Sequence, residues 1–330
     1  MNPERTPQQP PLINPLSDDL ERPLWSVMIP TYNCSAYLKE TLESVLMQDK
    51  GRTEMQIEVV DDGSTDADVE RLVREVGKGR VGFFRQKQNV GSLRNFETCL
   101  NRSQGKLVHL LHGDDKIKPG FYIKIEELLE KFPSAGAAFT GFSIMNEKSA
   151  ELLESDLIQK QEGIIDDWLC TIARKQLLQA CSIVVKRRVY EQLGGFYKVH
   201  FGEDWEMWTR IAANFPVAYS PKNLAAYRIH DNNITGSYLS SGQNIKDIKV
   251  VIDVIQNYLP REKRRKIKEA ARRNFSIGFA NQAQMIHKNE GSSKTALTQA
   301  QSALRLHFNA TTVTSLLKLY FKILLGYKKK

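Results

Sequence analysis

The sequence predicts an α/β fold, a doubly wound and mostly parallel sheet flanked by helices, followed by a helical C-terminal extension. Two observations lead to this prediction. Between Leu24 and the segment after Pro119, short apolar runs alternate with segments whose apolar residues recur at helical spacing. After Ser240, only helix-like mixtures of polar and apolar residues follow. Alternation of strand and helix is typical of parallel sheets, because a crossover helix joins one strand to the next.

Four strands are expected in the first part of the chain, each a short apolar run bounded by polar or turn-forming residues. In order, the runs are LWSVMIP (24–30), QIEVVDD (56–62), VGFFRQ (81–86) and KLVHLLHGDD (106–115). A helix is expected after each run, and Pro119 opens the fourth. The apolar residues that share one face in the first three helices are Leu38, Leu42, Val45 and Leu46; Val69, Leu72, Val73 and Val76; and Leu93, Phe96 and Leu100.

Three parts are expected along the chain. Residues 1–23 hold half of the twelve prolines and few apolar residues, which predicts a flexible leader. Residues 24–239 should form the α/β domain, and residues 240–330 a basic helical module. Residues 261–330 contain 16 Lys and Arg against 3 Asp and Glu, a balance of +13, so the net charge of +9 leaves −4 for residues 1–260. This asymmetry is expected where one end of a protein meets a polyanion or an anionic membrane surface.

The composition favours a cytoplasmic protein. No stretch approaches the roughly 20 apolar residues that a membrane span needs, and the N-terminal region lacks the apolar core of a signal peptide. The cysteines lack the close spacing of zinc sites, so we expect reduced, packed thiols instead of disulfides. They are Cys34, Cys99, Cys170 and Cys181.

Two acidic pairs follow two of the predicted strands. Asp61 and Asp62 follow QIEVV, and Asp114 and Asp115 follow KLVHLL. Parallel sheets bind ligands beyond the carboxyl ends of their strands, so both pairs should emerge at one edge. Four converging carboxylates need a cation or strong hydrogen-bond donors, and a hard divalent ion such as Mg²⁺ or Mn²⁺ takes oxygen ligands. The alternative is that each pair only caps a helix or turn.

Further segments occur in a defined order from about Leu24 to Thr235. They are SVMIPTYNCSAYLKETLESVLMQ, IEVVDDGSTD, NVGSLRNFETCLNRSQGKLVHLLHGDD, GGF, GEDWEMWTRIA and YRIHDNNIT. Together they resemble family two of the inverting, nucleotide-sugar-dependent glycosyltransferases, of the type that builds bacterial cell-surface polysaccharides. The resemblance implies a GT-A fold, a nucleoside-diphosphate sugar donor with a UDP-sugar favoured, a divalent metal, and a glycan or lipid-linked acceptor.

The resemblance also assigns the residues that bind the nucleotide. Pro30, Thr31 and Tyr32 resemble the loop that lies against the nucleobase and ribose. Asp62 resembles the carboxylate that accepts a hydrogen bond from the base. Arg94, in the segment LRN, resembles the basic residue on the nucleotide side of the site.

The same resemblance implies a metal site. Asp115 resembles the ligand that binds the metal with the diphosphate, and Asp114 lies beside it, near the ribose or the metal. His112 stands where the family often has an acidic residue, and we interpret it as an ordinary loop histidine. For His230, at the end of YRIH, approach to the metal or diphosphate and a plain surface position are both open.

The segment GEDWEMW resembles the acceptor side of the family's site. Inverting transfer needs one base to accept the proton of the attacking hydroxyl, and the resemblance assigns this task to Asp204. It places Glu203 and Trp205 on the acceptor side. The segment also fits the polar first turn of an amphipathic helix whose Trp205, Trp208 and Ile211 face inward, and the two interpretations are compatible.

The last helical segment, from Leu316 to Leu325, is apolar, too short to span a bilayer, and bounded by lysines. It fits a helix that lies in a membrane interface, which would give a peripheral position on the cytoplasmic membrane face. It also fits a packed final helix with a solvated lysine end. Nucleic acid is not expected as a partner, because no known binding motif accompanies the basic residues.

Two other function classes are alternatives to a glycosyltransferase for this sequence. A dinucleotide-dependent oxidoreductase would share the α/β sheet, but no G-x-G-x-x-G segment follows the first predicted strand. A non-catalytic module that binds a nucleotide sugar or carbohydrate would keep the sheet and lose the carboxylates. Asp115 and Asp204 are both present, which favours the enzyme.

Overall fold

The computed structural model describes residues 5–17, 21–230, 238, 241–289 and 292–326, and the chain divides into two compact units. The first unit consists of Met1–Trp168, Leu177–His200 and Asn214–His230, and the second of Leu169–Gln176, Phe201–Ala213 and Asp231–Lys330. The domain boundary expected between residues 239 and 240 lies outside the described residues. Two internal segments group with the C-terminal helices, a division that the sequence pattern did not predict.

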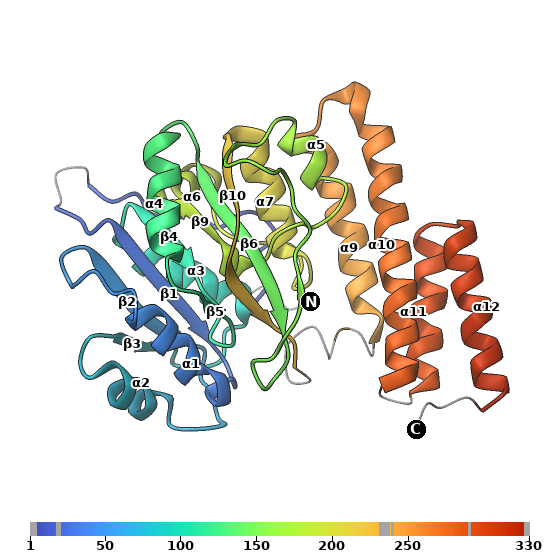
Figure 1. Cartoon of the computed structure of the whole chain (residues 1–330), viewed down its shortest axis with the longest axis horizontal. Helices are drawn as coiled ribbons and strands as arrows, with labels where there is room; N and C mark the ends of the chain where they lie inside the picture. The colour runs from blue at the N-terminus through green and yellow to red at the C-terminus, as the bar shows by residue number, and fades with distance from the viewer. Residues whose placement is uncertain (1–4, 18–20, 231–237, 239–240, 290–291, 327–330) are drawn as a thin grey trace. The chain divides into compact units, whose positions relative to one another are not determined.

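The first unit is built on one mixed sheet with the strand order β3-β2-β1-β4-β9-β6-β10-β5 (Figure 1). Strands β3, β2, β1 and β4 are parallel to one another, whereas β9 lies antiparallel between β4 and β6. The strands are β1 (Trp25–Thr31), β2 (Met55–Asp61), β3 (Gly82–Arg85), β4 (Leu107–Leu110), β5 (Lys116–Ile117), β6 (Ala137–Met145), β7 (Glu151–Glu154), β8 (Gly163–Ile164), β9 (Ile183–Lys186) and β10 (Val217–Arg228). The α/β fold class is confirmed. The strands β3, β2, β1 and β4 are all parallel, and antiparallel pairing begins at β9.

Helices cover both faces of this sheet, as expected for a doubly wound arrangement. The helices of the first unit are α1 (Ser35–Leu46), α2 (Val69–Gly77), α3 (Ser92–Arg102), α4 (Phe121–Lys131) and α6 (Arg187–Leu193), with a 3-10 turn at Ala180–Ser182. Buried residues of α1, α2 and α4 share one cluster with alternate residues of β1 and β2. Helix α3 contacts β1, β2 and β4 without joining that cluster, so it covers the opposite face.

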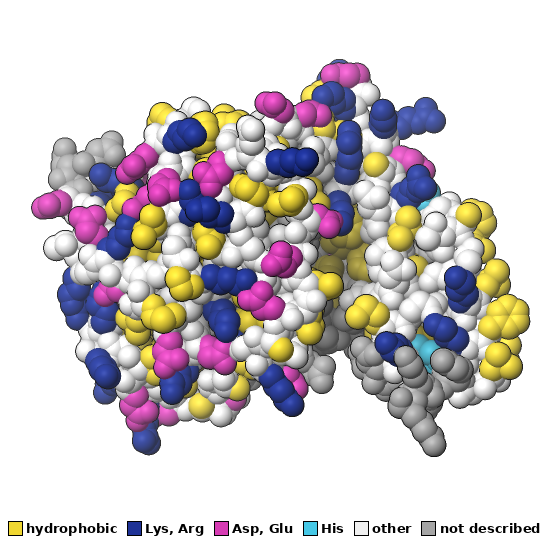
Figure 2. All heavy atoms as spheres, viewed as in Figure 1, with side chains coloured by type: hydrophobic (Ala, Val, Ile, Leu, Met, Phe, Trp, Pro, Cys, Tyr) yellow, Lys and Arg dark blue, Asp and Glu magenta, His cyan; other side chains and the backbone are white. Residues whose placement is uncertain are grey.

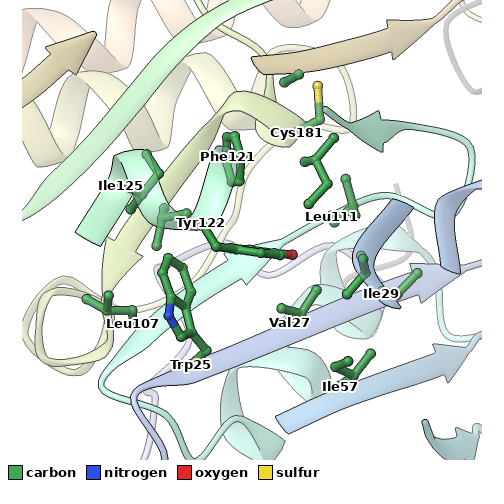
Figure 3. Packing of buried hydrophobic residues seen from close by; sticks show 14 of the residues in the cluster. Trp25, Val27, Ile29, Ile57, Leu107, Leu111, Phe121, Tyr122, Ile125 and Cys181 are labelled. Atoms are coloured by element: carbon green, nitrogen blue, oxygen red, sulfur yellow. The ribbon is translucent and has the colours of Figure 1, made fainter. Parts of the chain in front are cut away.

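The main core lies between the sheet and α1, α2 and α4 (Figure 3). Trp25, Val27 and Ile29 contribute alternate side chains of β1 to this core, because successive side chains of a strand point to opposite faces. The ring of Trp25 meets Tyr122 of α4 edge-on, with 4.8 Å between ring centroids. This packing fixes the strands whose carboxyl ends carry the acidic pairs. All four cysteines are buried, and none forms a disulfide, as predicted.

The prediction of a flexible leader is wrong for residues 5–17. Ile13 is fully buried in the first unit. The backbone carbonyl of Pro11 accepts a hydrogen bond from Gly195 N at 2.8 Å, and that of Pro7 accepts one from Lys198 N at 2.9 Å. Proline lacks an N–H group but keeps its carbonyl, so a proline-rich segment can dock in extended form as an acceptor. Composition alone could not reveal that the segment around Gly195 and Lys198 binds these proline carbonyls.

The second unit is helical. Its helices are α5 (Trp168–Ile172, whose first residue groups with the first unit), α7 (Glu203–Asn214, whose last residue does likewise), α9 (Gln243–Ile255), α10 (Arg261–Asn289), α11 (Ser293–Leu306) and α12 (Ala310–Leu324), with a 3-10 turn at Gln256–Tyr258. Helices α10, α11 and α12 pack around a small core formed by Ala283, Ile286, Ala296, Ala300 and Leu319. Among the described residues, no helix is both long and apolar enough to cross a membrane.

Candidate active site

The carboxyl ends of β1, β2 and β4 bring the predicted donor residues of the first unit together. Thr31 lies opposite Asp61 in the parallel register of β1 and β2, and Asp62 N donates to Thr31 O at 2.8 Å. Beyond β4, Gly113 N donates to Pro30 O at 3.1 Å. Both acidic pairs therefore emerge at the same edge of the sheet, as predicted.

Gly113 allows the turn after β4 to approach β1 closely. A Cβ atom at this position would lie 2.8 Å from the Thr31 Oγ1 and 3.0 Å from the Cys34 Sγ. Only glycine fits there without displacement of a neighbour. The Thr41 hydroxyl lies 3.0 Å from the carbonyl of Gly113 and 2.7 Å from that of Asp115, so α1 helps to hold the turn. The acidic pair of this turn is thus fixed beside the end of β1.

The two carboxylates of the first acidic pair have different partners. Asp61 accepts a hydrogen bond from Arg85 at 2.6 Å and others from Ser64, so it closes the loop after β2. Asp62 binds the loop before α3: Oδ1 accepts from Val90 N at 2.7 Å and Oδ2 from Gly91 N at 2.9 Å. Burial raises the pKa of Asp62, although these two hydrogen bonds oppose the shift.

Tyr32 and Asn33 form the loop after β1. Tyr32 is half exposed, which leaves its ring accessible for stacking. Asn33 adopts the left-handed region at φ +48°, and its Oδ1 accepts from Thr65 N at 2.8 Å. Asn33 N in turn donates to Ser64 Oγ at 3.0 Å. Asn33 was not among the predicted site residues, although asparagine is among the few residues that adopt a positive φ readily.

Arg94 lies in the first turn of α3, just after the loop that binds Asp62. Its guanidinium donates to Glu97 at 2.6 Å in an ion pair that is about one third exposed on the Arg94 side. The N-terminus of α3 carries the partial positive charge of a helix dipole, which favours anions. Arg94 therefore adds a full positive charge to a helix end that follows the predicted nucleotide carboxylate.

A potential metal site lies in the turn after β4. One side-chain donor atom from each of His112, Asp114 and Asp115 lies within 4.8 Å of the other two. His230, two residues after the end of β10, joins this group through a 3.0 Å hydrogen bond between its Nε2 and Asp114 Oδ2. A surface position for His230 is therefore excluded, because the residue is only 8% exposed.

Asp115 is only 1% exposed, and its two oxygens differ. Oδ1 accepts a hydrogen bond from Arg228 N at 2.9 Å. Oδ2 is buried and has no partner of normal hydrogen-bond geometry among the described residues, although the Cys181 thiol approaches the carboxyl. His230 Nδ1 is also buried without a partner in this part of the chain. A buried carboxylate oxygen without a hydrogen-bond partner, in a group with His112 and Asp114, fits a divalent cation, because Mg²⁺ and Mn²⁺ prefer oxygen ligands.

The electrostatics of this turn are also compatible with a bound cation. Burial, with a smaller contribution from Asp114, raises the pKa of Asp115 well above its usual value. Burial also acts to raise the pKa of Asp114, but the hydrogen bond from His230 and the nearby His112 lower it overall. Burial lowers the pKa of His112, which favours the neutral imidazole. A cation at the turn would stabilise both carboxylates in their charged form.

Arg228 supports the acidic turn after β4. This arginine was not among the site residues predicted from the sequence. Its side chain is fully buried, donates to Asp114 O at 2.7 Å and to Glu40 at 3.0 Å, and stacks 4.7 Å from the centroid of Tyr37. A buried arginine costs free energy unless all its donors are satisfied, which indicates a structural purpose. The sequence offered one indication of a role for Arg228, which is its position in YRIH, two residues before His230.

The predicted base belongs to the second unit, where Glu203 and Asp204 form the first turn of α7. Asp204 Oδ1 accepts from Trp205 N at 2.7 Å, and Oδ2 accepts from Gln176 Nε2 at 2.6 Å. Burial raises the pKa of Asp204 to about 6, a suitable value for a general base. Burial, followed by the charge of Asp204, raises the pKa of Glu203 well above normal.

Trp205 does not have the exposed acceptor position that we predicted. Its side chain is fully buried, its indole N–H donates to Ile172 O at 2.7 Å, and its ring packs against Phe275 at 4.6 Å. A buried ring cannot touch an acceptor. The alternative prediction from helical spacing, an inward-facing residue that holds α7 in place, is confirmed.

Comparison with known proteins identifies relatives over most of the chain. The profile of the family described as Glycosyl transferase family 2 matches residues 26–180. A putative teichuronic acid biosynthesis glycosyltransferase of Bacillus subtilis, TuaG, is 30% identical over 223 residues, which cover 66% of this chain and 83% of TuaG. An uncharacterized glycosyltransferase of Haemophilus influenzae is 26% identical over 250 residues, or 72% of this chain and 75% of that protein.

Solved structures share the fold. Residues 1–349 of S. aureus TarS in complex with UDP-GlcNAc superpose with a TM-score of 0.66 at 17% identity, over 93% of each chain. The mannosyltransferase PcManGT from Pyrobaculum calidifontis, in complex with GDP-Man and Mn²⁺, gives a TM-score of 0.56 at 18% identity, over 98% of this chain and 84% of that one. At this identity the superpositions establish the fold alone.

Proposed function

The chain belongs to glycosyl transferase family 2, and from this premise we propose that it transfers a sugar, with inversion, from a nucleoside-diphosphate sugar to an acceptor hydroxyl. A UDP-sugar is the favoured donor. The UDP-GlcNAc bound by TarS and the GDP-Man bound by PcManGT support the donor class. Asp62, Asp115 and Asp204 would supply the carboxylates that this reaction requires.

On the donor side, we assign nucleotide binding to the loop after β1 and to Asp62. The half-exposed Tyr32 ring can stack on a base, and a carboxylate can accept a hydrogen bond from a base N–H group. Asp62 already accepts from the loop before α3, so nucleotide binding and the order of that loop are coupled. Arg94 contributes positive charge for the diphosphate from the first turn of the same helix.

A divalent ion, Mg²⁺ or Mn²⁺, would be held by Asp115 and His230, with Asp114 beside them. The buried Oδ2 of Asp115, which has no hydrogen-bond partner of normal geometry within the described part of the chain, is the observation that carries this assignment. When bound, the ion would neutralise charge on the leaving diphosphate. The surrounding residues keep the turn ordered: Arg228 N holds Asp115 Oδ1, and His230 holds Asp114 Oδ2.

We assign the general base to Asp204. The acceptor oxygen attacks the anomeric carbon on the face opposite the diphosphate, the bond from that carbon to the diphosphate oxygen breaks, and the hydroxyl proton passes to the Asp204 carboxylate. Gln176 and Trp205 N orient that carboxylate. Glu203, whose raised pKa favours the neutral form, would help to shape the acceptor side.

The acceptor is proposed to be a glycan or a lipid-linked glycan of the bacterial cell envelope, on the cytoplasmic side of the membrane. The assignment of TuaG to teichuronic acid biosynthesis supports an envelope polysaccharide. The basic C-terminal residues support sugar transfer near anionic lipid, because positive charge attracts anionic headgroups.

The test is a screen of UDP- and GDP-sugars for donor hydrolysis and transfer, with Mn²⁺, with Mg²⁺ and with excess chelator. Metal-dependent turnover of one donor is the expected result. Binding of a nucleotide sugar without any turnover would favour the non-catalytic alternative, and full turnover in chelator would remove the metal from the proposal.

A further inference from the structure

Helix α12 carries two apolar faces, and only one of them is packed. Its inner face contributes Leu316, Leu319 and Ile323 to the core shared with α10 and α11. The outer face has the same helical spacing and remains exposed: Leu317 52%, Tyr320 38%, Phe321 63% and Leu324 79%. Soluble helices normally show one apolar stripe and one polar face, so the second stripe needs a separate explanation.

The stretch of sequence that forms this outer face, residues 291–330, is basic. From residue 291 to the end of the chain, the sequence contains no Asp or Glu. The basic residues of this stretch are Lys294, Arg305, Lys318, Lys322, Lys328, Lys329 and Lys330. Figure 2 shows hydrophobic side chains along the outer edge of α12 with Lys and Arg side chains beside them. The face therefore combines apolar area with positive charge.

We propose that the outer face of α12 docks on an anionic lipid surface, with the helix lying in the interface. An interfacial helix requires an apolar stripe flanked by Lys or Arg, and α12 meets both conditions. Exposed Lys318 lies beside Leu317 in sequence, and exposed Arg305 lies in the last turn of the neighbouring α11. Both can reach headgroups while the stripe contacts acyl chains.

The charge argues for lipid over a second copy of the chain. Two copies joined through this face would bring two basic surfaces together without an acidic residue from this stretch to offset them. Anionic headgroups supply the missing negative charge. The inference goes beyond the proposed function, because lipid binding requires neither donor nor turnover.

The test is sedimentation of the full chain with vesicles of phosphatidylcholine alone or mixed with phosphatidylglycerol. The wild type should bind the mixed vesicles at least about tenfold more tightly, and salt should weaken the binding. The variant Leu317→Gln, Phe321→Gln and Leu324→Gln should lose about tenfold or more in affinity. Glutamine is a good helix former, so α12 should persist, which circular dichroism would verify.

The matched control replaces three exposed leucines of the first unit: Leu152→Gln, Leu153→Gln and Leu157→Gln. It should bind vesicles like the wild type, and both triple variants should keep donor hydrolysis. A second variant, Arg305→Gln with Lys318→Gln, should reduce binding to anionic vesicles while leaving the weak binding to neutral vesicles unchanged. The proposal is overturned if the α12 variant binds like the wild type, if lipid charge has no effect, or if the α12 variant only converts a dimer in solution to a monomer.

Discussion

The backbone N–H of Arg228 donates to one oxygen of Asp115 at 2.9 Å, and the other oxygen is buried with no hydrogen-bond partner of normal geometry among the described residues. The contact joins the last residue of β10 to the turn after β4, two segments more than a hundred residues apart in sequence. The backbone supplies this donor, and the side chain of the same residue also holds the turn through Asp114 O at 2.7 Å. The orphan oxygen is therefore held in place before any ligand binds.

Asp115→Asn should abolish the response of the protein to metal. In the wild type, excess Mn²⁺ should raise the melting temperature, because a ligand that binds only the folded state stabilises it. The variant should show no such rise and should lose metal-dependent binding of a nucleoside diphosphate in calorimetry. Asp166→Asn, at an exposed position of the first unit, is the control and should respond like the wild type. A full metal response in Asp115→Asn would contradict the assignment.

Asp62→Asn should weaken nucleotide binding and leave the response to metal intact. Its carboxylate binds the loop before α3 and is proposed to accept from the base, so affinity for the nucleoside diphosphate should fall about tenfold or more, in line with loss of hydrogen bonds to a charged group. The Mn²⁺-dependent rise in melting temperature should remain. Identical behaviour of the Asp62 and Asp115 variants would show that the two carboxylates do not have separate tasks.

Asp204→Asn should lower kcat by roughly 10²–10⁴, the usual contribution of a positioned general base, while donor affinity stays close to that of the wild type. The amide keeps the shape of the side chain but cannot accept the proton. Glu262→Gln is a suitable control, since Glu262 is an exposed acid in the first turn of α10. A kcat within about threefold of wild type would place the base on another residue.

The pH profile should report Asp204 directly. Burial raises its pKa to about 6, and the base acts as a carboxylate, so kcat should rise with pH through about 6 and then level off. The raised pKa also means that the folded state retains the proton where the unfolded chain has lost it. Stability should therefore fall as pH increases from about 4 to about 6. In Asp204→Asn, the limb of the rate profile should disappear and the fall in stability should become smaller, because other buried carboxyls with raised pKa values, such as Asp115 and Glu203, still contribute to it.

Local patterns in the sequence were sufficient for the first half of the sheet. Strands β1 to β4 and the helices between them lie at the predicted positions, because the spacing of apolar residues within each segment was enough to predict it. The antiparallel position of β9 between β4 and β6 was not predicted, since it depends on pairing between distant segments. The grouping of 169–176 and 201–213 with the C-terminal helices depends on contacts of the same kind.

The candidate site shows the same limit. The carboxylates at the ends of β2 and β4 could be found because strand ends and acidic pairs are local signals. Arg228 and Asn33 were missed because their importance arises from partners far along the chain, Asp114 and Thr65. The resemblance of GEDWEMW to the family places Trp205 on the acceptor side, whereas the burial of its ring against Phe275 excludes contact with an acceptor.

Two adjacent residues of the leader provide a test of whether it is part of the folded first unit. Ile13 is fully buried, whereas Leu12 is 70% exposed. Ile13→Ala should reduce the free energy of unfolding by about 2–5 kcal/mol, the usual loss for such a truncation in a core. Leu12→Ala removes a side chain of the same size from an exposed position and should change stability by less than about 0.5 kcal/mol. Denaturant unfolding measures both, and equal effects of the two substitutions would show that the leader is not docked in solution.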